Sequence, residues 1–177
     1  FARKYPKLDP RYIFLNQGFN LRPTDVQAAM GLNQFKRVDN FIKIRTKNRD
    51  KIINGLKNDS RWKNQFQFVE IPKNIFPSFM GLPILLNKKM NKEVKMKLLF
   101  YLESKGIETR PILTGNFLNQ PSIKLFGLNN NKLKFKGAQT IEELGFLIGL
   151  HTKQIKKQHL DLIINSLFYI NRISKNF

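Results

Sequence analysis

The feature that most constrains this chain is a helix start followed by an unusually long helical pattern. Thr24 and Gln27 form a capping-box pair, in which each side chain can bond the other residue's backbone N–H. Apolar residues then recur at helical spacing as far as Leu56. They are Val26, Met30, Val38, Phe41, Ile42, Ile52, Ile53 and Leu56. The pattern predicts one helix from Thr24 to about Leu56, with Gly31 packed closely against another backbone.

Short strands and helices are expected after this helix. Apolar or alternating runs predict strands at 65–71, 78–86, 107–110 and 145–150. Asn91 is placed to begin a helix that ends at Gly106 in a Schellman cap, and Thr152 is placed to begin a last helix that runs to about Leu167. Residues 111–136 are expected to be a loop and 168–177 a frayed or packing tail. This order predicts an α/β layer domain.

Composition excludes several classes of protein. A chain of 177 residues with 41% hydrophobic residues and sixteen Phe is long and apolar enough for one packed domain. It has no apolar run of the roughly 18 residues that a bilayer span needs, and its start does not resemble a signal peptide. It has no cysteine, which excludes disulfides and thiolate metal sites. We therefore expect a cytoplasmic protein without a membrane partner, and the first residue, Phe1, predicts a truncated or processed chain.

The net charge leaves two interpretations open. With 32 Lys and Arg against 12 Asp and Glu, the chain carries a formal charge of +20, which is typical of nucleic-acid-binding proteins. The basic residues are spread along the sequence, however, and no five like charges are adjacent. This distribution favours a solvated basic surface over nucleic-acid binding. A stand-alone basic binding module remains the alternative function.

The residues alone contain little chemistry. Neither the dinucleotide-binding nor the P-loop glycine pattern occurs. His151 and His159 do not have metal-ligand spacing, and His151 is expected to be a partly buried or capping histidine. No pair of carboxylates suggests acid–base catalysis. No catalytic residue is therefore assigned to this chain.

The run from Gly18 to Ala29, G-F-N-L-R-P-T-D-V-Q-A-A, changes this picture. It resembles, without a gap, a signature of the DegT-type sugar aminotransferases, which have the aspartate-aminotransferase fold. The resemblance implies that Asn20 reaches across a dimer interface to the cofactor phosphate of the other subunit. Asn20 taken by itself would instead be a turn residue at the start of the helix.

Three later segments are similar to the nucleotide-sugar 3-dehydratase branch of that family, which acts in lipopolysaccharide biosynthesis. They are Ser78–Pro83, Thr109–Pro121 and Gly145–His151, so the resemblance extends over about residues 10–167. There are departures from the branch pattern. Phe79-Met80 replaces Trp-Phe, and Leu147 replaces Trp. Ordinary aminotransferases usually have a histidine shortly after the Arg-Pro pair, and this chain has none there.

The resemblance implies the C-terminal small domain of a fold-type I enzyme that uses pyridoxal 5′-phosphate or pyridoxamine 5′-phosphate. Residues 1–22 would be the remnant of the large-domain junction and dimer-interface loop, and 23–177 the small domain. The lysine or histidine that works with the cofactor would belong to the missing N-terminal half, so the isolated chain is expected to be inactive. The complete protein would be a homodimer joined through the cofactor site. Without cysteines here, a dehydratase of the metal-free kind is favoured, although the missing half could supply them.

The implied substrate is a nucleotide-linked 4-keto-6-deoxyhexose, with dehydration and transamination both left open. Arg110 and Asn116 are predicted to bind the sugar or its diphosphate, and Arg22 is a further candidate. Arginine suits phosphate because its planar fork donates paired, charge-assisted hydrogen bonds. Each residue also has a structural interpretation: Arg110 in a surface ion pair, Asn116 in a turn, and Arg22 as the approach to the helix.

Overall fold

An antiparallel sheet lies at the centre of the protein. The computed structural model describes residues 4–16, 18–127 and 132–174. The described strands are β1 (Phe66–Phe68), β2 (Gly81–Leu86), β3 (Thr109–Arg110) and β4 (Gly145–Gly149), in the order β1-β2-β4-β3. The register pairs Ile84 with Phe146 and Leu82 with Ile148, so their side chains point to the same face. All four are buried, which explains why one face of the sheet carries helices.

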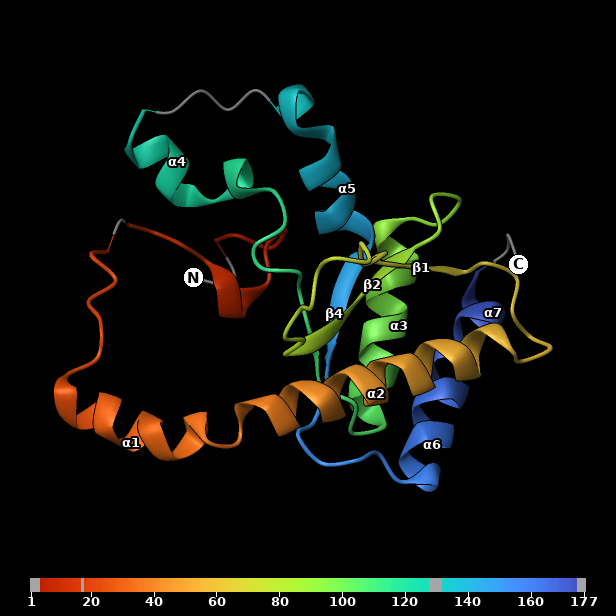
Figure 1. Cartoon of the computed structure of the whole chain (residues 1–177). Coiled ribbons are helices and arrows are strands. Elements are labelled where there is room, and N and C mark those ends of the chain that lie inside the picture. The colour runs from red at the N-terminus through yellow and green to blue at the C-terminus, as the bar shows by residue number, and fades with distance from the viewer. Residues whose placement is uncertain (1–3, 17, 128–131, 175–177) are drawn as a thin grey trace.

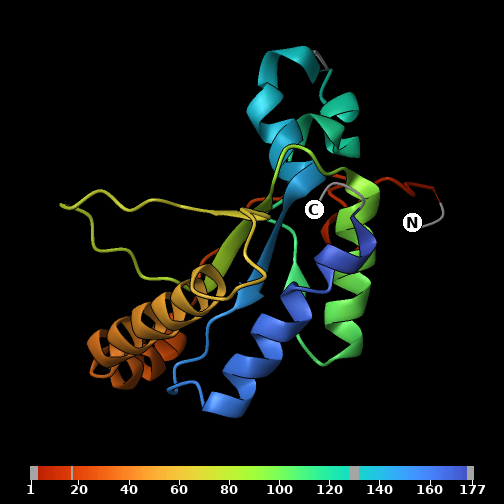
Figure 2. The same ribbon diagram turned by 90° about the vertical axis from the view of Figure 1, so that its right-hand side faces the viewer.

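The helices α2 (Val38–Lys57), α3 (Lys92–Ser104), α6 (Lys157–Leu167) and α7 (Ile170–Ile173) build the core with the sheet. Figure 2 shows α3, α6 and α7 on one side of the sheet, and α2 packs beside α6. Shorter helices are α4 (Pro121–Leu125) and α5 (Lys136–Leu144), together with single 3-10 turns at Pro10–Tyr12, Phe117–Asn119 and Lys132–Phe135. The expected small sheet packed by helices is confirmed.

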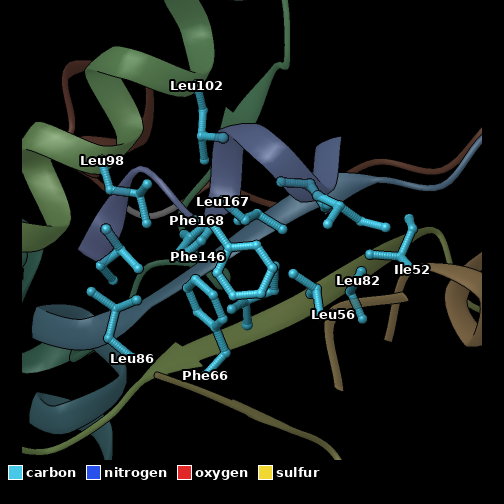
Figure 3. Packing of buried hydrophobic residues seen from close by; sticks show 14 of the residues in the cluster. Ile52, Leu56, Phe66, Leu82, Leu86, Leu98, Leu102, Phe146, Leu167 and Phe168 are labelled. Atoms are coloured by element: carbon cyan, nitrogen blue, oxygen red, sulfur yellow. The ribbon is translucent and has the colours of Figure 1, made fainter. Parts of the chain in front are cut away.

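The core is one cluster of large apolar side chains from these elements. Figure 3 shows the rings of Phe66 and Phe146 among Leu56, Leu102 and Leu167. Each such side chain, when fully buried, stabilises the fold by about 1.5–3 kcal/mol. The core therefore joins α2, the central strands β2 and β4 and the C-terminal helices into one unit.

The prediction of a single helix from Thr24 to about Leu56 was wrong, because two helices occupy this range, α1 (Asp25–Phe35) and α2. The break lies at Lys36 and Arg37, where the Arg37 N–H donates to the Gln34 carbonyl in a tighter turn. Asp39 in the first turn of α2 favours a new helix N-terminus. The break lets α2 bury Ile52 and Leu56 in the core, whereas α1 runs past the domain (Figure 1).

Three predicted caps at helix ends are confirmed. The Thr24 N–H donates to Gln27 Oε1 at 2.8 Å, and Asn91 accepts the Val94 N–H at 3.0 Å, as expected. The Schellman cap is also confirmed, because Gly106 has φ +77 and the Ile107 N–H donates to the Leu102 carbonyl. These three signals depend only on neighbouring residues, so sequence spacing was enough to find them.

The predicted start of the last helix at Thr152 was wrong, because α6 begins at Lys157. The buried side chain of Asn48 on α2 holds the intervening segment. Its amide nitrogen donates to the carbonyls of His151 and Lys153, and its oxygen accepts the Ile155 N–H. A long-range partner thus satisfies backbone groups that a helix would otherwise have used.

The expected loop at 111–136 includes α4 and the beginning of α5, and the tail is packed as far as it is described. Pro121 stands at the first position of α4, where its missing N–H costs nothing. Phe168 and Ile170 are buried in the core, and Tyr169 stacks on Tyr101 with ring centroids 3.8 Å apart. Residues 175–177 lie outside the described residues.

Candidate functional site

The arm, residues 18–24, carries the first two candidate residues and stands clear of the domain (Figure 1). Asn20 has φ +49, a left-handed conformation that asparagine tolerates better than most residues. No atom lies within 4 Å of the position of a Cβ on Gly18. Asn20 and Arg22 are exposed, and among the described residues their side chains make no hydrogen bond or ion pair. The Asn20 amide is therefore free to donate outward.

The helix that follows the arm presents apolar side chains to solvent. Not one residue of α1 is buried. Phe19 in the arm is 94% exposed and Phe35 is 74% exposed, and Val26, Met30 and Leu32 are similarly uncovered. Gly31 has no atom within 4 Å of its Cβ position, so the close packing predicted there is not present within this chain. With 3.6 residues per turn, Val26 and Met30 lie on one side of α1 and Leu32 and Phe35 on another, so apolar side chains are uncovered around the helix. Exposed apolar side chains gathered in this way are typical of protein–protein contacts.

The segment before the arm is held against the domain. Arg11 donates to the Thr109 carbonyl at 3.0 Å and pairs with Asp9 at 2.9 Å. The Phe14 N–H donates to the side-chain oxygen of Gln120, and the Phe14 carbonyl accepts the Ser122 N–H. The arm therefore leaves the domain beside the loop that follows β3, where the other two candidates lie.

Arg110 lies on the edge strand β3 with its side chain exposed. Its guanidinium pairs with Glu108 at 2.8 Å, and this hydrogen bond raises the pKa of Arg110 further above its ordinary value. The structure thus shows the surface ion pair that was the structural alternative. An exposed pair of this kind adds little to stability, so the guanidinium can exchange Glu108 for a stronger anion at little cost.

Asn116 is only 2% exposed, and both ends of its amide are used within the protein. Its oxygen accepts the Leu118 N–H, and its nitrogen donates to Gln139 Oε1 at 3.0 Å. Its backbone N–H donates to Glu142 Oε2 at 3.0 Å. We call the contacts of Gly115, Asn116 and Asn119 with Gln139 and Glu142 the 115–142 junction. Asn116 holds this junction together, and sugar binding by Asn116 stays a prediction.

Gly115 explains why the junction is so close. Its φ is +66, and a Cβ added there would lie 2.6 Å from the Cβ of Glu142. Any side chain would push the loop away from α5. The Gly-Asn pair in the Thr109–Pro121 segment is therefore required by the backbone of this loop.

Sequence reasoning missed a buried lysine next to the junction. Lys95 on α3 is 6% exposed, and its ammonium donates to the carbonyls of Glu142 and Gly145 at the C-terminal end of α5. A cation suits the negative end of a helix. Burial lowers the pKa of Lys95 to about 8. A signal existed in the sequence, because Lys95 shares the helical face of Leu98 and Leu102.

A cavity of about 580 Å³ lies between residues 6–12, α3 and the start of the loop after β3. Lys95 and Glu142 line it together with apolar side chains such as Leu8, Leu99 and Ile112. The cavity begins next to Arg110, because Pro111 is part of its wall. Its wall also includes Gly115, which precedes the candidate Asn116.

The histidines have no metal-binding arrangement. His151 is exposed, and its Nδ1 accepts the Lys153 N–H at 2.9 Å, which is a local capping contact. Within the described ranges, no three His, Cys, Asp or Glu side chains are grouped as metal ligands. Among the same residues, no helix has both the length and the apolar character needed to cross a membrane.

Two curated relatives are similar to most of this chain. RfbH, a lipopolysaccharide biosynthesis protein of Salmonella typhimurium, is 30% identical over 164 residues, covering 89% of this chain and 35% of the relative. GDP-4-keto-6-deoxy-D-mannose 3-dehydratase of Escherichia coli O55:H7 is 30% identical over 148 residues, covering 82% and 36%. The chain thus spans little more than a third of the length of either relative.

Solved structures show the same fold. The E. coli GDP-4-keto-6-deoxy-D-mannose-3-dehydratase with bound hydrated PLP matches with a TM-score of 0.63 at 23% identity, over 94% of this chain and 44% of that one. A mutant of the enzyme (ColD) with bound GDP-perosamine matches with the same TM-score at 24% identity and the same coverage. The family model matches residues 3–168, nearly the whole sequence. The chain belongs to the DegT/DnrJ/EryC1/StrS aminotransferase family.

Proposed function

We propose that this chain is the C-terminal part of a cofactor-dependent enzyme that converts a nucleotide-linked 4-keto-6-deoxyhexose during surface-polysaccharide synthesis. The observation that carries the proposal is the arm with Asn20, which leaves a packed domain and has no partner within it. The family match over residues 3–168 and the names of the relatives support the substrate class. The uncovered apolar side chains of α1 support a larger assembly.

Pyridoxal or pyridoxamine phosphate, when bound, would supply an electron sink for chemistry next to the sugar ketone. The residues of this chain fit a supporting part in that site. The exposed amide of Asn20 can donate to a phosphate oxygen, and Arg22 can add a cationic donor two residues later. No described residue here is assigned a proton-transfer role, so the catalytic lysine or histidine would come from the remainder of the polypeptide.

The arm suits a contact with a second subunit. It points away from its own domain (Figure 1), and α1 with its uncovered apolar side chains follows it directly. We propose that both are covered in a homodimer, so that Asn20 reaches the cofactor phosphate of the partner. Arg110 would bind the diphosphate or sugar from the β3 edge after release of Glu108. Residues 1–22 would then be the junction with the large domain, and 23–177 the small domain.

The decisive experiment is subunit complementation in the full-length gene product that contains this chain. Asn20→Ala alone should weaken cofactor binding at least tenfold, whereas Asn54→Ala on the exposed side of α2 should leave it unchanged. Asn20→Ala is then co-expressed with a variant that lacks the catalytic lysine or histidine. If Asn20 acts in trans, mixed dimers keep one complete site, and activity returns to about a quarter of wild type.

If Asn20 acted within its own subunit, both sites of the mixed dimer would be defective and no activity would return. Unaltered cofactor affinity in Asn20→Ala would remove the assigned role altogether. The identity of the residue at the cofactor position separates the two reactions, because lysine indicates transamination and histidine indicates 3-dehydration.

The alternative, a basic binding module, rests on the formal charge of +20. A module of this kind should be monomeric and should bind nucleic acid with a steep dependence on salt. The exposed apolar side chains of α1 instead support self-association of the isolated chain. Sedimentation together with DNA binding at two salt concentrations distinguishes the two functions.

A further inference from the structure

We infer that Glu142 is a positioning residue, which fixes the loop after β3 and thereby sets the affinity for the nucleotide sugar. This inference rests on the proposed function, because it assumes that Arg110 and the neighbouring loop face that substrate. Glu142 lies on α5 and touches neither Arg110 nor the arm in the contacts described above. It would act through the 115–142 junction.

The carboxylate of Glu142 holds two residues of the loop at once. Its Oε2 accepts the backbone N–H of Asn116 at 3.0 Å and the side-chain amide of Asn119 at 2.8 Å. Hydrogen bonds to a carboxylate contribute more than those between neutral groups. Gln139, one turn earlier, accepts from the amides of both asparagines. Helix α5 therefore grips the loop through two side chains on one face.

The approach of the loop to Glu142 leaves no freedom for another arrangement. Gly115 lies against the side chain and backbone of Glu142, with its Cβ position 2.9 Å from the Glu142 Cα. The preceding Leu113 and Gly115 itself both have positive φ, at +50 and +66. Glycine adopts a positive φ without strain, but a leucine does so only when its surroundings hold it there. The carboxylate provides the strongest of these contacts.

Glu142 is also held from the opposite side. Its carbonyl accepts a hydrogen bond from the buried ammonium of Lys95 on α3. Lys95 thereby fixes the end of α5 to a helix whose Leu98 and Leu102 are fully buried in the core. The chain of contacts runs from the core through Lys95 and Glu142 to the loop. The loop therefore takes its place from the core and not from the neighbouring surface.

The consequence for binding follows from the position of Arg110. Only four residues separate it from Gly115, and its partner strand β4 begins at Gly145, three residues after Glu142. Release of the junction would free the loop and the end of the edge strand together. Arg110 would then have to be ordered at the moment of binding, which weakens affinity for the substrate. Cofactor binding by Asn20 on the arm should not depend on it.

The test uses the full-length gene product with Glu142→Ala, Glu142→Gln and a control, Glu93→Ala. Glu93 is an exposed carboxylate on α3 that pairs with Lys97, so its removal makes the same change in charge without touching the loop. The probes are GDP-perosamine and dTDP-glucose, and titration calorimetry uses whichever binds wild type more tightly. Cofactor affinity and the separate values of KM and kcat are measured on the same preparations.

For Glu142→Ala we expect at least a tenfold weaker affinity for the probe, a matching rise in KM, and cofactor affinity within twofold of wild type. Glu142→Gln keeps an acceptor oxygen and should stay within about threefold of wild type for the probe. Glu93→Ala should match wild type. A folded Glu142→Ala protein with unchanged probe affinity would overturn the inference.

A second variant covers the case in which Glu142→Ala does not fold. Asn119→Ala removes one of the two donors to Glu142 Oε2 and should weaken probe binding about threefold to tenfold. Unchanged affinity there would also overturn the inference. Failure of the proposed function has a different signature, because wild type itself would then bind neither the cofactor nor either probe.

Discussion

The arm and the 115–142 junction use the same residue type in opposite ways. Asn20 in the arm is exposed and its amide has no partner among the described residues, whereas every hydrogen-bonding group of Asn116 that could face a ligand is used within the domain. Each asparagine follows a glycine or an aromatic in a segment typical of the family. The difference shows that an asparagine in such a segment can either stay free for a contact outside the domain, as proposed for Asn20, or fix a backbone shape, as Asn116 does.

The two regions also differ in what their apolar side chains do. Phe146 and Leu102 are fully buried, and their burial stabilises the fold. Phe19 and Phe35 are exposed and contribute nothing comparable to the isolated chain. Exposed apolar surface of this kind is typical of a surface that another one covers, which is the contact proposed for α1. The stability of the isolated domain therefore comes from the core, and the arm and α1 are left for the proposed assembly.

The largest expected effect comes from exchanging one phenylalanine in each region. Phe146→Ala should lower the free energy of unfolding by about 3–5 kcal/mol, because it removes a fully buried ring from the central strand. Phe35→Ala should change it by no more than about 0.5 kcal/mol. Urea unfolding followed by fluorescence measures both, since Trp62 is the only tryptophan and stacks on Phe68 at 6.2 Å. A comparable cost for Phe35→Ala would show that α1 is already covered in solution.

Sequence reasoning succeeded where the partners are close in sequence or share a period. The capping residues Thr24 and Asn91 and the Schellman glycine Gly106 needed only local spacing, and apolar periodicity located α3 and the central strands. The family signature located the arm. These features describe elements and motifs, and they leave the contacts between distant segments open.

The errors came from contacts over long distances in sequence. Asn48 captures the segment that Thr152 was expected to begin as a helix, although about a hundred residues separate them. The long helix breaks because only its second half reaches the core. Glu142 and Gln139 carried no pattern of their own, so the role of Asn116 in the junction was invisible before the loop and α5 were seen together.

Three glycines separate the two reasons why the junction excludes a side chain. Gly115→Ala combines a positive φ with a clash against Glu142 and should cost about 3 kcal/mol. Gly127→Ala has a similar φ of +63 with open space and should cost about 1 kcal/mol. Gly18→Ala in the arm has neither problem and should cost less than about 0.5 kcal/mol. Thermal unfolding of the three variants gives the series, and equal costs for Gly115 and Gly127 would contradict the clash.

A smaller effect is expected in the pH dependence of stability, through Lys95, whose ammonium holds the end of α5 beside the 115–142 junction. Burial lowers the pKa of Lys95 to about 8, from 10.5 in the unfolded chain. Between these values the unfolded state binds more protons, so stability should rise with pH from about 8 to 10.5. We expect a gain of about 2 kcal/mol, since each pKa unit corresponds to about 1.4 kcal/mol and solvent screens part of it. Lys95→Met should flatten the urea-unfolding profile over this range, and parallel profiles would contradict the lowered pKa.

The smallest effect concerns the loop after β3, whose buried polar groups have partners within the domain with one exception among the described side chains. Ser122 is buried, and its hydroxyl has no hydrogen-bond partner in the part of the chain that the structure describes. A buried polar group without a partner destabilises, so Ser122→Ala should raise the free energy of unfolding by about 0.5–1 kcal/mol. Thr140→Ala is the control, because its hydroxyl donates to the Lys136 carbonyl one turn earlier on α5 and its loss should not stabilise. A loss of stability in Ser122→Ala would mean that the hydroxyl is satisfied in solution, and the loop beside Phe14 would then be bound through water as well as through the backbone.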